Sequence, residues 1–228
     1  MNVEISPFGH DWPFSKAKTS LLRAAALVMR EEGPRSATLK NIAARAGVTE
    51  PAIFRHFAGV DGLFEALFTV VEFFFRRLEV RFLDCDTPGL ERLHAAYEDL
   101  VDVLQDSVEF GYLVIHADPI FRQYAALRQR LEDIRAASRE RVIDCLREAQ
   151  DIGQIPADMD VDTLAVSLIG AVALLLTEWS RGNDMIDPSA SMRRVWEGVR
   201  SIFSVAEPAG APSANGGTAY ERARERVT

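Results

Sequence analysis

The chain has 228 residues, of which 48% are hydrophobic and 26% are charged. This balance excludes wholesale disorder, which needs few hydrophobic residues and a high net charge. The formal net charge of −8 is unevenly distributed, because residues 15–60 hold eight Lys or Arg against three Glu, whereas residues 61–228 hold eighteen against twenty-nine Asp or Glu. A basic segment on an otherwise acidic chain favours contact of that segment with a polyanion.

The predicted elements are all helical, because no segment of the ordered region shows the two-residue alternation typical of a strand. Residues 1–14 are predicted to be a flexible arm. A helix with an apolar stripe follows from Ser15 to about Glu32, and Gly33 and Pro34 end it.

Two short helices are predicted next, close together in the chain. Thr38 can cap a helix over residues 39–46, Gly47 permits a sharp turn, and Thr49 can cap a second helix that ends near Phe57. The predicted contact between these helices consists of small or apolar residues, namely Ala43, Val48, Ile53 and Phe57. This pattern predicts a helix-turn-helix, in which the outer face of the second helix is free to enter a DNA major groove.

Beyond residue 59 the helices lengthen. They are predicted at residues 60–84, 90–105, 109–116, 120–150 (straight or kinked), 163–181 and 188–205. The fold class is therefore all-α with about nine helices, divided into a DNA-binding domain over residues 15–60 and a ligand-binding and dimerisation domain over residues 61–206. Residues 207–228 are rich in Pro, Gly, Ala and Ser and are predicted to be a disordered tail.

Over residues 18–68 the sequence resembles the TetR family of transcriptional regulators. The residues that carry the resemblance are Gly33, Thr38, Ile42-Ala43, Ala46-Gly47-Val48, the aromatic-x-His-Phe run from Phe54 to Phe57, and Leu63-Phe64-x-x-Leu67. The resemblance implies a DNA-binding regulator, usually a repressor, with a helical body that dimerises and senses a small molecule. Two positions depart from the family pattern. Phe54 stands where the family usually has Tyr, and Val60 stands where Lys is common, so two phosphate contacts are lost.

By this resemblance, Thr38 and His56 contact backbone phosphates, and the recognition helix presents further residues to bases or flanking phosphates. The full predicted DNA-binding set is Thr38, Lys40, Arg45, Thr49, Glu50, Pro51, Ala52, Phe54, Arg55 and His56. The chemistry of the side chains agrees in part. Arg55 can bind guanine or phosphate, and Glu50 can accept a hydrogen bond from cytosine, while Lys40 and Arg45 suit backbone electrostatics. The alternative is a helix cap at Thr38 and solvated surface side chains at Arg55 and His56.

The last two helices are predicted to form the interface of a homodimer, as helices of two subunits can build a four-helix bundle. The predicted interface residues are Leu164, Leu168, Ala171, Leu175, Val195, Val199, Ile202 and Phe203. The alternative is that these stripes pack only within one subunit.

A pocket in the body is predicted from aromatic and apolar residues, several with polar tips. Its predicted lining is Tyr97, Leu100, Phe110, Tyr112, Leu113, His116, Tyr124 and Trp179. The alternative is that these side chains are ordinary core. The many phenylalanines favour an apolar or aromatic effector.

An enzyme is not expected, because the four histidines are scattered and neither an HExxH motif nor a glycine-rich phosphate loop is present. No metal and no cofactor is predicted. Cys85 and Cys145 are expected to be reduced thiols of a cytoplasmic protein, and no signal peptide is evident. No membrane contact is expected, because the longest uncharged apolar run, residues 163–177, falls short of the ~20 residues that span a bilayer, and it is interpreted as a buried helix. A competing hypothesis is a module of the same fold that binds proteins or small molecules, with DNA binding weak or lost.

Overall fold

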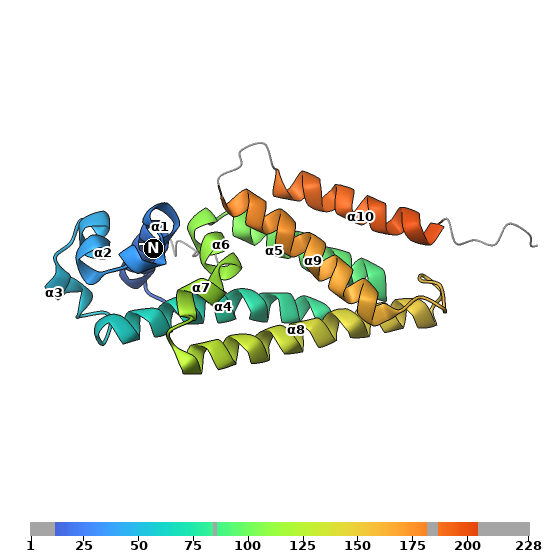
Figure 1. Cartoon of the computed structure of the whole chain (residues 1–228), viewed down its shortest axis with the longest axis horizontal. Coiled ribbons are helices and arrows are strands. Elements are labelled where there is room, and N and C mark those ends of the chain that lie inside the picture. The colour runs from blue at the N-terminus through green and yellow to red at the C-terminus, as the bar shows by residue number, and fades with distance from the viewer. Residues whose placement is uncertain (1–11, 84–85, 182–186, 205–228) are drawn as a thin grey trace, which may run out of the picture.

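The computed structural model describes residues 12–83, 86–181 and 187–204, the last three of these by their backbone only. Within this part of the chain the regular secondary structure is entirely helical, which confirms the all-α prediction (Figure 1). The elements are α1 (Lys16–Glu32), the short 3-10 helix η1 (Pro34–Ser36), α2 (Leu39–Ala46), α3 (Glu50–Ile53), α4 (Gly59–Phe82), α5 (Gly89–Gln105), α6 (Val108–Ile115), α7 (Ala117–Phe121), α8 (Ala125–Asp151), α9 (Val161–Ser180) and α10 (Pro188–Ser204). We call α1–α3 the head and α4–α10 the body. The predicted arm before residue 12, the predicted tail and Cys85 lie outside the described residues.

Side-chain and glycine caps set the ends of α1 and α2 as the sequence predicts. Ser15 Oγ accepts a hydrogen bond from the Lys18 N–H at 3.3 Å at the start of α1, and Gly33 takes a φ of 90° just past its end. Thr38 Oγ1 accepts from the Asn41 N–H at 3.2 Å, so that α2 begins at the predicted residue. Each side-chain cap satisfies a backbone donor that the first helical turn leaves without a partner.

The long helix α4 joins the head to the body. Gly59, with a φ of 74°, allows the chain to turn into the helix, which continues for 24 residues. At 1.5 Å per residue this is about 36 Å. The predicted domain boundary between residues 60 and 61 falls within the first turn of α4, so any tilt of this helix displaces the head.

The predicted helix over residues 120–150 is two helices in the structure, and this correction accounts for the extra element. α7 ends at Phe121, a turn closed by the Tyr124 N–H and the Phe121 carbonyl at 2.9 Å follows, and α8 begins at Ala125. No Pro or Gly marks this break in the sequence. Instead Phe121 is fully buried and packs edge-on against Phe64 and Phe68, with ring centroids 6.3 and 5.1 Å apart. Packing in the core therefore ends α7.

Trp12, just before α1, packs at the junction of head and body. Its ring lies edge-on to Phe73 of α4, with centroids 5.0 Å apart, and 5.6 Å from Phe110 of α6. Beside it, Arg23 of α1 forms an ion pair with Glu109 of α6 at 3.1 Å. The head is therefore attached to the body through α6 as well as through α4.

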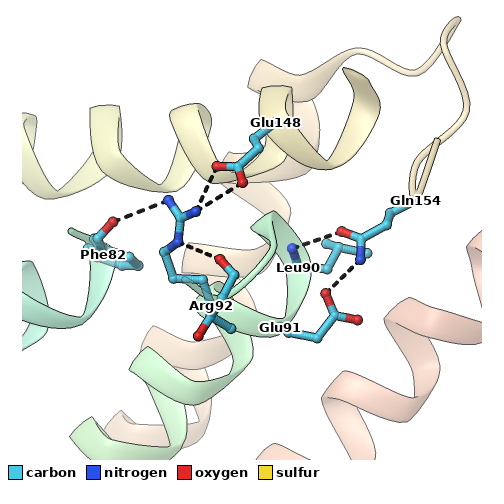
Figure 2. A network of polar contacts seen from close by, with 7 residues as sticks. Phe82, Leu90, Glu91, Arg92, Glu148 and Gln154 are labelled. Carbon is cyan, nitrogen blue, oxygen red and sulfur yellow. Dashed lines mark hydrogen bonds and ion pairs between the residues drawn. The ribbon is translucent and has the colours of Figure 1, made fainter. Parts of the chain in front are cut away.

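At the opposite end of the body, polar side chains tie α4, α5 and α8 together (Figure 2). Arg92 of α5 is buried and donates two hydrogen bonds to the Glu148 carboxylate, at 2.8 and 2.9 Å. The same guanidinium donates to the backbone carbonyls of Thr87 at 3.0 Å and Phe82 at 3.5 Å. Gln154 adds two bonds to the first turn of α5. We call this set the distal network, because it fixes the end of α4 that lies farthest from the head.

The prediction that residues 163–177 form a buried helix is wrong. The helix around them, α9, is 20 residues long, and only 22% of its most apolar 18-residue window is buried, although its mean hydropathy there is 1.8. By length and composition alone α9 could cross a membrane. Within the described residues it packs on α6, α8 and α10 with one side, and they leave an apolar face of α9 uncovered.

Candidate nucleic-acid interface

The turn between α2 and α3 is built on Gly47. This residue adopts the left-handed conformation, with φ 68° and ψ 30°, and the next N–H, of Val48, returns to the Ala43 carbonyl at 3.0 Å. Ile53 and Phe57 then fold inward and are buried, as predicted. Val48 was predicted to fill the same contact, but it is 41% exposed, because the chain leaves the glycine turn on the outer side.

The recognition segment, from Thr49 to His56, forms a short helix followed by tight turns. α3 covers only Glu50–Ile53, so the helix ends four residues before the predicted end near Phe57. The N–H groups of His56 and Phe57 both bond to the Ile53 carbonyl, at 2.9 and 3.0 Å, and these bonds close tight turns over the remaining residues. Pro51 lies in the first turn, as predicted. Thr49 occupies the N-cap position, yet its side chain makes no capping hydrogen bond, which corrects the prediction and leaves its hydroxyl for another partner.

The predicted DNA-binding residues share one property in the structure, namely that they lie at the surface of the head. All are exposed except Ala52, which is half-buried; the exposed ones are Thr38, Lys40, Arg45, Thr49, Glu50, Pro51, Phe54, Arg55 and His56. The outer face of the second helix is thus accessible to a nucleic acid. It presents hydroxyl, guanidinium and imidazole groups that can bond to phosphates or base edges.

The two basic side chains of α2, Lys40 and Arg45, differ in whether an ion pair within the protein already holds them. Arg45 donates to the Glu31 carboxylate of α1, at 3.3 Å through one nitrogen and more closely through the other, and this hydrogen bonding raises the pKa of Arg45. A phosphate must therefore compete with Glu31 for it. Lys40 is exposed, and among the described residues no ion pair holds it.

Two exposed apolar side chains stand where the family resemblance expects polar ones. Phe54 is 56% exposed and Val60 is 41% exposed. Neither side chain can donate a hydrogen bond to a phosphate, so this edge of the head offers fewer hydrogen-bond donors than the family pattern that the sequence resembles.

The residues predicted to line an effector pocket are mostly packed into the core of the body. Tyr97, Phe110 and Leu113 are buried, and burial raises the pKa of the Tyr97 hydroxyl. Tyr124 packs on the Phe64 ring with centroids 4.7 Å apart. These side chains therefore fill space between helices in this conformation.

Three of the predicted pocket residues do meet at the junction of α6 and α9. His116 Nε2 lies 2.9 Å from Ser180 Oγ, and the Tyr112 ring lies 4.4 Å from the imidazole. Burial lowers the pKa of His116 and raises the pKa of Tyr112. Trp179 lies in the same place, against Gly111 of α6. The cluster joins α6, which contacts the head, to the exposed helix α9.

Three grooves or clefts of the body lie away from this cluster. A groove between α4 and α8 encloses about 190 Å³, a cleft between α5 and α10 about 230 Å³, and a minor one between α4 and α5 about 10 Å³. Of the predicted pocket residues only Leu100 lines one of these three, the minor one. The groove between α4 and α8 is lined by Glu72, Phe75, Arg76, Glu79, Phe82, Ile134, Ala137, Ser138 and Arg141. Sequence reasoning missed it because most of these residues fit the solvated charged face of a helix equally well.

The predicted dimer-interface residues whose side chains the structure describes are all at least partly buried within their own chain. Leu168 is buried, and Leu164, Ala171, Leu175, Val195 and Val199 are half-buried. The side chains of Ile202 and Phe203 lie outside the described residues. The apolar face that α9 leaves open is on its other side, where Val166 is 57% and Leu174 is 64% exposed, with Gly170 and Ala173 exposed between them. At about 100° per residue this face lies opposite the predicted stripe.

Two family models match the chain. The model described as "Bacterial regulatory proteins, tetR family" matches residues 21–67, and the model described as "Tetracyclin repressor-like, C-terminal domain" matches residues 89–181. Together they cover more than half of the chain, including the candidate interface and most of the body.

Curated relatives and solved structures agree with these matches. The chain is 26% identical to the HTH-type transcriptional repressor BepR of Brucella suis over 87% of this chain and 96% of that protein. It is 24% identical to the HTH-type transcriptional regulator AcrR of Shigella flexneri over 72% of this chain and 78% of that protein. The fold is similar to that of the transcriptional regulator FadR from Bacillus subtilis in complex with stearoyl-CoA, with a TM-score of 0.62, 20% identity, and coverage of 80% of this chain and 97% of that one.

Proposed function

Because the chain belongs to the TetR family of bacterial transcriptional regulators, we propose that it is a cytoplasmic repressor that binds an operator as a homodimer and is released by a small apolar or aromatic effector. The observation that carries the proposal is the outward position of the recognition segment, from Thr49 to His56, on a basic head. An alternative module without DNA binding is not favoured, since the relatives are DNA-binding regulators.

We assign roles in DNA binding by side-chain chemistry. Thr38, His56 and Lys40 contact phosphates, and Arg55 reads a base edge or a flanking phosphate. The Thr38 hydroxyl can serve both as cap and as contact, because its oxygen accepts from the Asn41 N–H while its hydrogen is left to donate. Glu50, Thr49, Pro51, Ala52 and Phe54 lie against the groove walls.

The homodimer is proposed to form through the open face of α9. Val166 and Leu174 are each more than half exposed, and Gly170 and Ala173 between them allow a second helix to approach closely. Burying this face against its copy removes apolar surface from water at roughly 25 cal/mol per Å². Two recognition segments related by a two-fold axis then read two half-sites about one helical turn apart.

Release is proposed to follow from a change in the tilt of α4. This helix carries the head directly, and α6 supports the head through the Arg23–Glu109 ion pair. An effector that binds better to a conformation with a different α4 tilt alters the spacing of the two recognition segments and so weakens operator binding. The FadR complex with stearoyl-CoA supports ligand binding by a protein of this fold.

Gel retardation with the intergenic DNA beside the gene tests the proposal. We expect sequence-selective retention that an unrelated duplex of equal length does not compete away. Arg55→Ala is expected to weaken specific binding by roughly 1–3 kcal/mol, whereas Arg128→Ala on the exposed side of α8 leaves it unchanged. If the folded wild-type chain shows no selective retention at any salt concentration, the proposal is contradicted.

Sedimentation equilibrium tests the dimer. Leu174→Arg places a charge in the open face of α9 and is expected to shift the chain to monomers, while Leu83→Arg, at another exposed apolar position, leaves the dimer intact. A dimer of undiminished affinity in Leu174→Arg would assign the interface to another surface.

A further inference from the structure

We propose that the groove between α4 and α8 binds a small carboxylate with an apolar body, and that this groove is the effector site. Its effect on DNA rests on the repressor function proposed above, whereas the binding itself does not. We call it the α4–α8 groove. The helices run in the same direction along it, since Arg130 pairs with Glu72 and, farther along both, Arg141 lies 3.9 Å from Glu79 (Figure 1).

The floor of the α4–α8 groove is apolar and short. Phe75 and Phe82 of α4 face Ile134 and Ala137 of α8 across about 190 Å³. The lining runs from Glu72 to Phe82, which is about 15 Å along a helix. This volume is below the roughly 300–1,000 Å³ of pockets for drug-sized ligands, so the occupant is small.

Two hydrogen-bond donors on the groove wall have no partner within the described part of the chain. The Arg76 guanidinium forms no ion pair there, and the Ser138 hydroxyl makes no hydrogen bond there. The helix register places Ser138 opposite the stretch from Arg76 to Glu79. A cationic and a neutral donor that face one another across an apolar floor suit a carboxylate, because guanidinium and hydroxyl groups both bond to its oxygens.

The carboxylates of the groove do not favour a cation in place of an anion. Glu72 is engaged by Arg130 at 2.7 Å, and Glu79 faces Arg141 at 3.9 Å. Each of these guanidinium groups also serves a second carboxylate, since Arg130 pairs with Glu65 at 3.0 Å and Arg141 with Asp144 at 3.8 Å. Arg76 differs from them because no carboxylate lies within ion-pair distance of it in the described part of the chain, so a bound carboxylate can take that place.

The groove lies between two polar attachments of α4 to the rest of the body. On the side nearer the head, Arg130 of α8 binds both Glu65 at 3.0 Å and Glu72 at 2.7 Å. On the far side, the distal network holds the Phe82 carbonyl through Arg92. Glu72 and Phe82 both line the groove, so an occupant touches a residue of each attachment. Filling the groove therefore acts on the helix that carries the head.

Isothermal titration calorimetry with the full chain tests the site without any DNA. The probes are 4-phenylbutyrate, the neutral 4-phenylbutan-1-ol and the cationic 4-phenylbutylamine, which share one apolar body. We expect 4-phenylbutyrate to bind at least tenfold more tightly than either of the others. Arg76→Gln is expected to abolish this preference, and Arg147→Gln, an exposed arginine of α8 outside the groove, to preserve it.

A second variant tests the location independently of charge. Ala137→Trp fills the groove from an exposed position of α8, so it is expected to weaken all three probes by at least tenfold while leaving the helical circular dichroism unchanged. Equal affinity of the three probes, or unchanged 4-phenylbutyrate binding in both folded variants, would overturn the proposal.

Adding the same probe to the operator complex separates the site from the function. Release of wild-type protein from DNA by 4-phenylbutyrate, with no release of Ala137→Trp, supports both. Calorimetric binding without any operator binding would leave the site standing and refute the repressor function. Operator binding without calorimetric preference for the carboxylate would refute the groove as a carboxylate site and leave the repressor function standing.

Discussion

Replacing Val60 by Lys should restore one of the two phosphate contacts that this head lacks. Val60 lies in the first turn of α4 and is 41% exposed, so a lysine fits there without disturbing the core. Each phosphate that a protein neutralises adds about 0.9 to the negative slope of log K against log salt. The added contact therefore raises the binding constant at about 0.1 M salt by a factor about eight times larger than the factor by which it raises it at 1 M salt.

Two local effects accompany the substitution: one lowers folding stability only, and the other reduces the gain in binding without changing its sign. A lysine in the first turn of α4 lies near the positive end of the helix dipole, which costs roughly 0.3–1 kcal/mol of folding stability. The neighbouring Asp61 is exposed and can pair with the new ammonium, although surface pairs contribute only about 0–1 kcal/mol. We therefore expect a slope change of somewhat less than 0.9 per subunit.

The assay is fluorescence anisotropy of a labelled duplex, titrated at several salt concentrations between about 0.05 and 0.3 M. A duplex of arbitrary sequence suffices, because the added contact is to phosphate. Val80→Lys is the matched control, since Val80 is 65% exposed on the same helix and the variant carries the same added charge far from the head. Equal slopes for the Val60→Lys and Val80→Lys variants would refute the placement of Val60 beside a phosphate.

Three further changes probe the body. Gly89→Ala is expected to lower the free energy of unfolding by about 3 kcal/mol, because a Cβ there would lie 2.4 Å from the Cys145 carbonyl oxygen. Arg92→Met removes the hydrogen bonds to Glu148 and to two backbone carbonyls, and should cost about 1.5–3 kcal/mol in chemical denaturation. Burial lowers the pKa of His116, so the stability it contributes is present above its ordinary pKa of about 6.5 and is lost as the pH falls. His116→Gln should therefore show a shallower loss of stability in acid than the wild type.

Each of these expectations has an outcome that contradicts it. Arg147→Met, which removes an exposed arginine 3.7 Å from Asp144, should leave the denaturation midpoint unchanged, and an equal loss in this variant and in Arg92→Met would assign no special role to the distal network. A Gly89→Ala chain of wild-type stability would mean that α5 and α8 can separate at little cost. An unaltered pH profile in His116→Gln would assign the acid sensitivity to other groups, among them His94, whose pKa burial also lowers.

The local structure of the head was predictable from the sequence because each helix cap and each turn depends on a few residues that are close together in the chain. Thr38 caps α2, Gly47 makes the left-handed turn, and Pro51 occupies the first turn of α3, all as predicted. The outward position of the recognition segment followed from the same pattern. The exposure of Val48 was not predictable, because it depends on the direction in which the chain leaves the turn.

In the body the sequence by itself determined that the chain is helical and approximately where its helices lie. The tertiary structure decided which face of each helix is buried. α9 is apolar on nearly all sides, so its periodicity could not distinguish the stripe of Leu164 and Leu168, which packs inward, from that of Val166 and Leu174, which is left open. The break before α8 and the α4–α8 groove likewise depend on residues far apart in the chain meeting in space. Capping and turn formation are local, whereas burial and cavity formation depend on neighbouring helices that periodicity along one segment does not reveal.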